Sequence, residues 1–193
     1  MTVLPARVPA VVEPPVARLL NAVGYQVVWI TAVAGAGAQL TWPGPVAALL
    51  FAVATLAFGG CARADLRTLA IALPLGFALD SLFSASGWLV YAQPMPWPLS
   101  WAAPLWIWAL WTAFAMTLNH SMSFLGQRLG LCALLGVVGG PLAYLSAAGA
   151  FDAVDFGRPL PQVLAALALS WGLVLPVLVG LNRRWSPSAH GAL

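Results

Sequence analysis

Four polar residues, Thr117, Asn119, His120 and Ser121, lie close together near the end of the tryptophan-rich apolar segment 99–125. A neutral histidine can take up or release a proton near pH 7, and it can also hydrogen-bond a polar headgroup. His120 is therefore the candidate catalytic residue, and all four are candidate ligand-binding residues. The alternative interpretation is that Asn119, His120 and Ser121 cap a helix end and are hydrated by water.

A second group of polar and aromatic residues lies in the segment 19–40. Asn21, Tyr25 and Trp29 recur at four-residue spacing, which places them on one face of a helix, with Gln26 beside them. Asn21 and Gln26 are further candidate ligand-binding residues. Because Asn21 enters its segment at the depth where the fourth apolar segment ends, we predict that it meets Asn119, His120 or Ser121.

Asp80 lies well inside an apolar segment, where a carboxylate is costly. A charged residue at the centre of a lipid-facing helix costs about 2.5 to 3.5 kcal/mol on insertion scales, so Asp80 is predicted to face the bundle interior, a cavity or a partner. No basic residue lies at that depth, so protonation or hydrogen bonds to hydroxyl and backbone groups must stabilise it. Asp80 is either a ligand or proton site or a neutral packing carboxyl.

The fifth apolar segment contains small residues and a proline ahead of Tyr144. Gly136 and Gly140 form a GxxxG pattern, which allows a neighbouring helix to approach closely. Gly139-Gly140-Pro141 predicts a kink, because proline removes a backbone hydrogen bond. Tyr144 is a candidate ligand-binding residue just beyond this point, and packing alone is the alternative.

The chain contains no recognisable metal or cofactor motif. Its two cysteines, Cys61 and Cys132, form no CxxC pair, and there are only two histidines. No GxSxG, HExxH, P-loop or dinucleotide-binding pattern is present. We therefore predict no metal site and no cofactor, with both cysteines as ordinary buried thiols.

The composition is that of a membrane protein. Of 193 residues, 62% are hydrophobic and 7% are charged, and the mean hydropathy is +0.91. Soluble domains contain about 25% charged residues, and a soluble domain of this size could not bury so much apolar surface. The net charge of +3 is small and dispersed, so nucleic acid is not an expected partner.

Six apolar segments match the length of a membrane span, since about 20 helical residues cross about 30 Å of hydrocarbon. The predicted spans are 19–40, 46–62, 68–87, 99–120, 129–151 and 160–181. The expected fold class is therefore all-α, a polytopic bundle of six transmembrane helices. Residues 1–18 are predicted to be a proline-rich cytoplasmic lead-in and residues 182–193 a cytoplasmic tail, with a non-helical interfacial cap over 88–98.

The arginines indicate the orientation of the bundle. Only Arg158 falls on one side of the predicted spans, and seven arginines fall on the other: Arg7, Arg18, Arg63, Arg67, Arg128, Arg183 and Arg184. The positive-inside rule then places both termini in the cytoplasm.

The first span also resembles a signal peptide, since Ala36-Gly37-Ala38 matches a cleavage site. We favour an uncleaved span, because the segment is longer than a usual signal-peptide core and contains Asn21 and Gln26.

Three pieces of the sequence resemble a known family. They are Asn21-x3-Tyr25-Gln26-x2-Trp29, the helix from Pro104 through Trp108 and Trp111 to Asn119-His120-Ser121, and Gly136-x2-Gly139-Gly140-Pro141-x2-Tyr144. Together they are similar to a bacterial family of small multipass inner-membrane proteins that is classed as a domain of unknown function. The resemblance runs from about residue 19 to 181. It implies a six-helix protein without an established activity, often encoded near methyltransferases that resemble cyclopropane-fatty-acid synthases.

Three functions are compatible with these observations. The first is an accessory or lipid-binding protein in membrane-lipid modification, with Asn21, Asn119 and His120 near the headgroup and lipid-modifying enzymes as partners. The second is the substrate-binding membrane subunit of a vitamin-type importer, in which Asp80 would hold a polar ligand. The third is a membrane-embedded lipid-modifying enzyme that uses His120 as acid or base.

Overall fold

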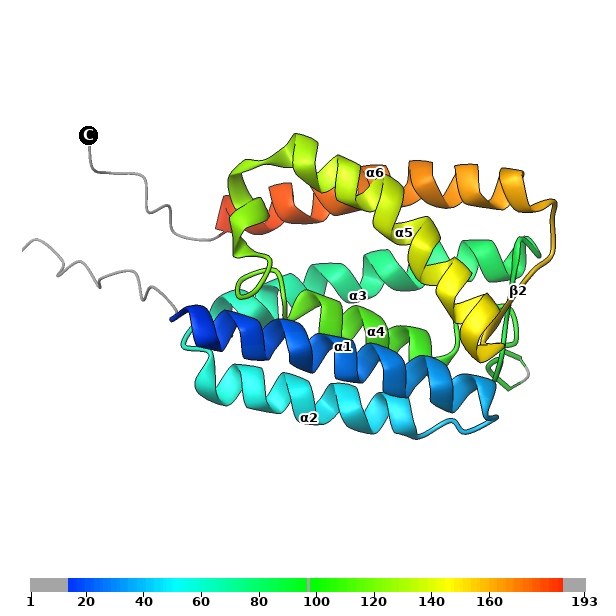
Figure 1. The fold of residues 1–193 in the computed structure, drawn as a ribbon, viewed down its shortest axis with the longest axis horizontal. Helices are drawn as coiled ribbons and strands as arrows, with labels where there is room; N and C mark the ends of the chain where they lie inside the picture. The colour runs from blue at the N-terminus through cyan, green and yellow to red at the C-terminus, as the bar shows by residue number, and fades with distance from the viewer. Residues whose placement is uncertain (1–13, 97, 186–193) are drawn as a thin grey trace, which may run out of the picture.

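The computed structural model describes residues 14–96 and 98–185 (Figure 1). Within these residues the chain forms six α-helices, one 3-10 helix and one two-stranded sheet. Most of the predicted lead-in 1–18 and of the predicted tail 182–193 therefore lies outside the described residues.

Four of the helices are long and apolar enough to span a membrane. They are α1 (Pro15–Gly37), α3 (Ala62–Ala85), α5 (Leu129–Phe151) and α6 (Leu160–Trp185). Two apolar helices are shorter: α2 (Pro43–Phe58) has 16 residues and α4 (Leu105–Ala115) has 11. At about 1.5 Å per residue α4 is only about 16 Å long, so a full crossing by α4 stays a prediction.

The helix boundaries follow from proline and from backbone hydrogen bonds. The helix α1 begins at Pro15, inside the predicted lead-in, because proline is well suited to the first helical position. The predicted fourth span, 99–120, is α-helical only over Leu105–Ala115. Beyond it the backbone N–H of Thr117 bonds Phe114 three residues back, at 3.0 Å, and the chain continues through turns into the 3-10 helix η1 (Ser123–Gln127).

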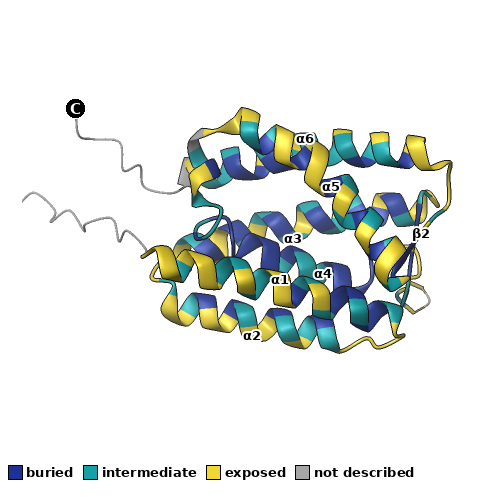
Figure 2. Ribbon diagram, in the orientation of Figure 1, coloured by how far each residue is buried: buried dark blue, intermediate teal, exposed yellow. Residues whose placement is uncertain are grey.

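The helix α4 lies at the centre of the fold. It packs against α1, α2 and α3, and most of its residues are buried (Figure 2). The helices α5 and α6 pack against each other, and α6 also contacts α3. The start of α1 and the end of α6 lie at the same end of the molecule (Figure 1). We call this the Asp65 end and the opposite one the Asp80 end, after two residues of α3.

A small antiparallel sheet joins two loops at the Asp80 end. Strand β1 (Leu89–Tyr91) pairs with β2 (Val154–Phe156), with Tyr91 opposite Val154. The prediction of a helical bundle is confirmed, but the all-α class misses this sheet. Strands of three residues are too short to show a clear alternating pattern, although the segment 88–98 was expected to be non-helical.

The close approach predicted for the GxxxG pattern is confirmed. A Cβ on Gly136 would overlap the backbone of Trp171 in α6, and a Cβ on Gly140 would overlap the Trp171 ring. The helix α5 continues through Pro141 over its whole length. The small residues therefore join α5 to α6 as one packed pair.

Candidate functional site

Asp80 is fully buried and accepts hydrogen bonds from three aromatic side chains. Tyr91 donates its hydroxyl to Oδ1 at 2.7 Å, Trp111 donates its indole N–H to Oδ2 at 2.7 Å, and the Tyr144 hydroxyl also donates to Oδ1. We call these four residues the Asp80 cluster. The prediction that Asp80 faces the interior and is stabilised by hydroxyl groups is confirmed.

The Asp80 cluster joins four parts of the chain, because its members come from α3, β1, α4 and α5. Burial, together with the charge of Asp80, raises the pKa of Tyr91 well above its ordinary value. The Tyr91 hydroxyl therefore stays protonated and remains a donor at neutral pH. An indole N–H can only donate, so Oδ2 must act as an acceptor.

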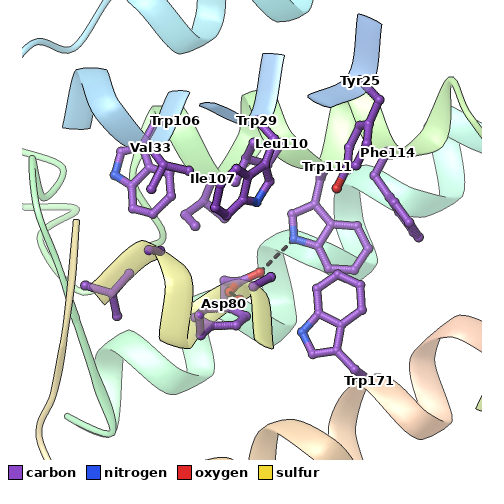
Figure 3. A pocket seen from close by; sticks show the side chains of 14 residues that line it. Tyr25, Trp29, Val33, Asp80, Trp106, Ile107, Leu110, Trp111, Phe114 and Trp171 are labelled. Atoms are coloured by element: carbon purple, nitrogen blue, oxygen red, sulfur yellow. Dashed lines mark hydrogen bonds between the residues drawn. The ribbon is translucent and has the colours of Figure 1, made fainter. Parts of the chain in front are cut away.

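A cavity of about 60 Å³ lies beside Asp80 (Figure 3). It is lined mainly by aromatic and aliphatic side chains from α1, α4, α5 and α6. The lining residues include Tyr25, Trp29, Val33, Trp106, Ile107, Leu110, Trp111, Phe114, Ala143, Tyr144, Ala147, Val154 and Trp171. The Trp171 ring stacks on Trp111 with their centroids 4.9 Å apart, and its buried Nε1 has no hydrogen-bond partner among the described residues.

Part of the polar and aromatic face predicted for the first helix lies at this cavity. Tyr25 and Trp29 both line it, whereas Gln26 is exposed and is not among its lining residues. Tyr144 both donates a hydrogen bond to Asp80 and lines the cavity. Of the predicted ligand-binding residues, Asp80 and Tyr144 therefore form one site, and Gln26 lies away from it.

The predicted contact between Asn21 and the end of the fourth segment is also confirmed. The Asn21 amide donates to the carbonyl of Met116 at 3.1 Å, and the Ser121 hydroxyl donates to Asn21 Oδ1 at 2.7 Å. Thr117 is buried and donates its hydroxyl to the Phe114 carbonyl at 2.7 Å, so it caps the C-terminal end of α4. Asn21 thus fastens α1 to the turns that follow α4.

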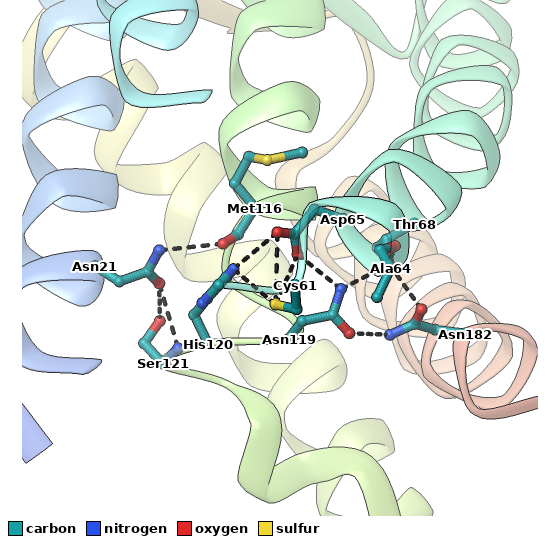
Figure 4. A network of polar contacts seen from close by, with 10 residues as sticks. All are labelled: Asn21, Cys61, Ala64, Asp65, Thr68, Met116, Asn119, His120, Ser121 and Asn182. Carbon is teal, nitrogen blue, oxygen red and sulfur yellow. Dashed lines mark hydrogen bonds and ion pairs between the residues drawn. The ribbon is translucent and has the colours of Figure 1, made fainter. Parts of the chain in front are cut away.

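Asn119 and His120 belong to a second polar group, at the Asp65 end (Figure 4). His120 Nε2 lies 3.1 Å from Asp65 Oδ2 and 3.5 Å from Cys61 Sγ, and the Asn119 amide donates to Asp65 Oδ1 at 2.9 Å. This group, which we call the Asp65 network, comprises Cys61, Asp65, Thr68, Asn119, His120 and Asn182.

Asp65 and Asp80 are thus each held by residues from other segments of the chain, and a family model covers both residues. The model of the family described as "Protein of unknown function (DUF2878)" matches residues 18–177. The chain belongs to this family. No curated protein and no solved structure matches the chain.

The matched region of this DUF2878 protein contains the whole Asp80 cluster and all of the Asp65 network except Asn182. It also contains every candidate site residue that the sequence predicts. The family description assigns no activity.

Sequence reasoning missed several residues of the Asp65 network in this DUF2878 protein. Asp65 lies between Arg63 and Arg67, in the stretch between the predicted spans 46–62 and 68–87, yet its side chain is fully buried. The signal was helical spacing: Asp65 and Thr68 fall on one face of α3, and Thr68 is also buried. Cys61 is half-buried beside Asp65, in contrast to the fully buried Cys132, which is the ordinary thiol predicted.

Proposed function

We propose that this protein is an integral protein of the bacterial inner membrane that binds an acyl chain of a membrane lipid in the cavity beside Asp80. The observation that supports this most directly is the lining of that cavity, which is aromatic and aliphatic on all sides except at the Asp80 cluster. Small-molecule sites are commonly apolar cavities with a few placed polar groups.

The position of the cavity favours a ligand that enters from the lipid. Trp29 of α1, and Ala143 and Trp171 of α5 and α6, all line the cavity and are only half-buried. The parts of the cavity lining that come from α1, α5 and α6 are therefore partly exposed on the surface of these apolar helices. A chain that enters between α1 and α5 would come directly from hydrocarbon.

The size of the cavity favours part of a chain over a whole water-soluble molecule. A single water needs roughly 10–15 Å³ of cavity volume, so a cavity of about 60 Å³ has room for several waters. A short segment of a hydrocarbon chain would also fit in it. This counts against the vitamin-importer alternative. Asp80 lines the cavity, but its carboxylate is 0% exposed and its oxygens accept hydrogen bonds within the Asp80 cluster, so the cavity offers a ligand a mainly apolar surface.

The arginine distribution supports the proposed orientation, with both termini in the cytoplasm. The start of α1 and the end of α6 lie at one end of the fold, which is compatible with it. A fluorescent protein fused after Leu193 should fold and fluoresce in the cytoplasm. An active periplasmic alkaline phosphatase fused at the same point would contradict the orientation.

The proposed biological role is that of an accessory protein in membrane-lipid modification, with lipid-modifying enzymes as partners. Its support is the lipid-accessible cavity together with the family resemblance. The membrane-enzyme alternative would depend on His120, which contacts Asp65 and Cys61 away from this cavity. No residue of the Asp65 network lines the cavity, so chain binding does not require that network.

The test is native mass spectrometry of the protein purified in mild detergent, with lipid identification after release. The wild type should retain a phospholipid or a fatty acid. Ala143→Leu fills the cavity from α5 and should reduce the retained lipid several-fold, since Ala143 lines it. Ala150→Leu is the matched control, because Ala150 is exposed on the same helix.

Equal lipid retention by Ala143→Leu, Ala150→Leu and wild type would overturn the assignment of the cavity. A retained water-soluble vitamin in place of lipid would overturn the proposed function itself and would favour the importer alternative.

A further inference from the structure

We propose that Cys61, Asp65 and His120 form a binding site for a divalent cation of the zinc type. The sequence predicts no metal site, because these residues show no ligand motif when read along the chain. In the folded protein their ligand atoms all lie within 4.8 Å of one another. This site is separate from the proposed lipid cavity and does not depend on it.

The three ligand atoms form a nearly regular triangle. His120 Nε2 lies 3.1 Å from Asp65 Oδ2 and 3.5 Å from Cys61 Sγ, and Cys61 Sγ lies 3.6 Å from Asp65 Oδ2. With Zn–S of about 2.3 Å and Zn–N or Zn–O of about 2.0–2.1 Å, tetrahedral angles put S about 3.5 Å and N about 3.3 Å from a neighbouring ligand atom. The observed triangle therefore has the dimensions of three tetrahedral zinc ligands.

The chemistry of the three side chains also favours zinc. Thiolate, imidazole and carboxylate are the three protein ligands that zinc uses, whereas magnesium and calcium prefer oxygen. A thiolate, a carboxylate and a neutral imidazole around Zn²⁺ have a net charge of zero. This matters because Asp65 is fully buried and His120 is 2% exposed, and an uncompensated buried charge is strongly destabilising.

The surroundings hold the three ligands in place. The Asn119 amide donates to Asp65 Oδ1 at 2.9 Å, which leaves Oδ2 directed at His120 and Cys61 (Figure 4). Such hydrogen bonds from neighbouring groups orient metal ligands in known sites. Gly59 packs against the imidazole so closely that a Cβ would lie 2.5 Å from His120 Cε1.

The local backbone also brings two of the ligands together. Cys61 is the N-cap of α3 and Asp65 lies one turn later on the same face. The N-terminus of a helix is a favourable place for anionic groups, and both of these ligands lie within the first turn of α3. Three protein ligands leave a fourth position for water or for a substrate atom, as in catalytic zinc sites.

The first experiment measures metal content. The full chain is purified without chelators and without a polyhistidine tag, and zinc is measured by inductively coupled plasma mass spectrometry, before and after dialysis against Zn²⁺. We expect about one zinc per wild-type chain, as for a single mononuclear site. Cys61→Ser should lose most of this zinc, and the matched control Cys132→Ser should keep it.

The second experiment identifies the ligands. Co²⁺ added to the metal-free wild type should give the visible absorption of a tetrahedral site and a thiolate-to-cobalt charge-transfer band in the near ultraviolet. The band should be absent in Cys61→Ser and present in Cys132→Ser. A folded wild-type protein that takes up neither Zn²⁺ nor Co²⁺, or that binds Co²⁺ without the thiolate band, would overturn the proposal.

A third measurement covers the case in which Cys61→Ser does not fold. Zn²⁺ should slow alkylation of Cys61 by N-ethylmaleimide in the wild type at least several-fold, because a metal-bound thiolate is a poor nucleophile. Mass spectrometry of peptides resolves Cys61 from the buried Cys132. Equal labelling of Cys61 with and without Zn²⁺ would overturn the proposal.

Discussion

Asp65 and Asp80 lie on the same helix, α3, about 22 Å apart along its axis, and both side chains are 0% exposed. Each is held by a different set of partners. Asp80 accepts hydrogen bonds from phenol and indole donors, whereas Asp65 contacts an imidazole, an amide and a thiol. One helix therefore positions a polar centre at each end of the bundle.

Tyr144→Phe should destabilise the protein by about 1.5 to 3 kcal/mol, the usual range for a hydrogen bond to a charged group. The substitution removes one donor from the buried Asp80. The measurement is unfolding in mixed micelles of mild detergent and dodecyl sulfate, followed by circular dichroism.

Tyr25→Phe is the matched control for this prediction. Tyr25 lines the same cavity, and its hydroxyl has no hydrogen bond with another described residue. We expect Tyr25→Phe to unfold within about 0.5 kcal/mol of wild type. If the two variants unfold together, the Asp80 cluster does not stabilise the fold as argued.

Asn21→Ala should loosen α1 from the turns after α4. Asn21 donates to the Met116 carbonyl and accepts from the Ser121 hydroxyl and backbone N–H, and these three bonds would be lost together. We expect a loss of about 1 to 3 kcal/mol of unfolding free energy, since the carbonyl of the buried Met116 is left unsatisfied. The measurement is the same unfolding transition, with limited proteolysis to locate the change.

Gln26→Ala is the control on the same helix. Gln26 is exposed, so the substitution should change stability by less than about 0.5 kcal/mol. A similar loss in both variants would mean that the effect comes from α1 as a whole and not from the Asn21 contacts.

Gly136→Ala should separate α5 from α6. The new methyl would overlap the backbone of Trp171, and helix backbones cannot move apart without losing contacts along the pair. We expect destabilisation of about 1 to 3 kcal/mol, the usual cost of overpacking.

Gly139→Ala, three residues further along α5, provides the comparison. A Cβ there meets nothing within 4 Å, and alanine is the better helix former by about 0.5 to 1 kcal/mol. This variant should be as stable as wild type or slightly more stable. Destabilisation of equal size in both variants would show that helix flexibility, and not the contact with Trp171, explains the glycines.

Several features could be predicted because they depend on cost or on local spacing. The burial of Asp80 follows from the price of a charge in hydrocarbon, and the contact of Asn21 with Ser121 follows from their equal depth on neighbouring segments. The close α5–α6 packing follows from the spacing of Gly136 and Gly140.

Other features could not be predicted, because their partners are distant in the chain. The donors to Asp80 come from Tyr91, Trp111 and Tyr144; Tyr144 was a candidate site residue, but nothing local indicates that any of the three donates to Asp80. The fourth span was predicted over 99–120 because apolar residues occur on both sides of α4, whereas the backbone before Leu105 and after Ala115 is not α-helical.

The sequence by itself determined that this chain forms a bundle of apolar helices, since hydrophobicity and helical length are local properties of each segment. It also determined that the carboxylate of Asp80 had to be kept away from lipid. Only the tertiary structure decided that His120 meets Cys61 and Asp65, because that contact joins residues 59 and 55 positions apart. This contact depends on how α3 is oriented relative to the turns after α4, and the packing of the whole bundle determines that orientation.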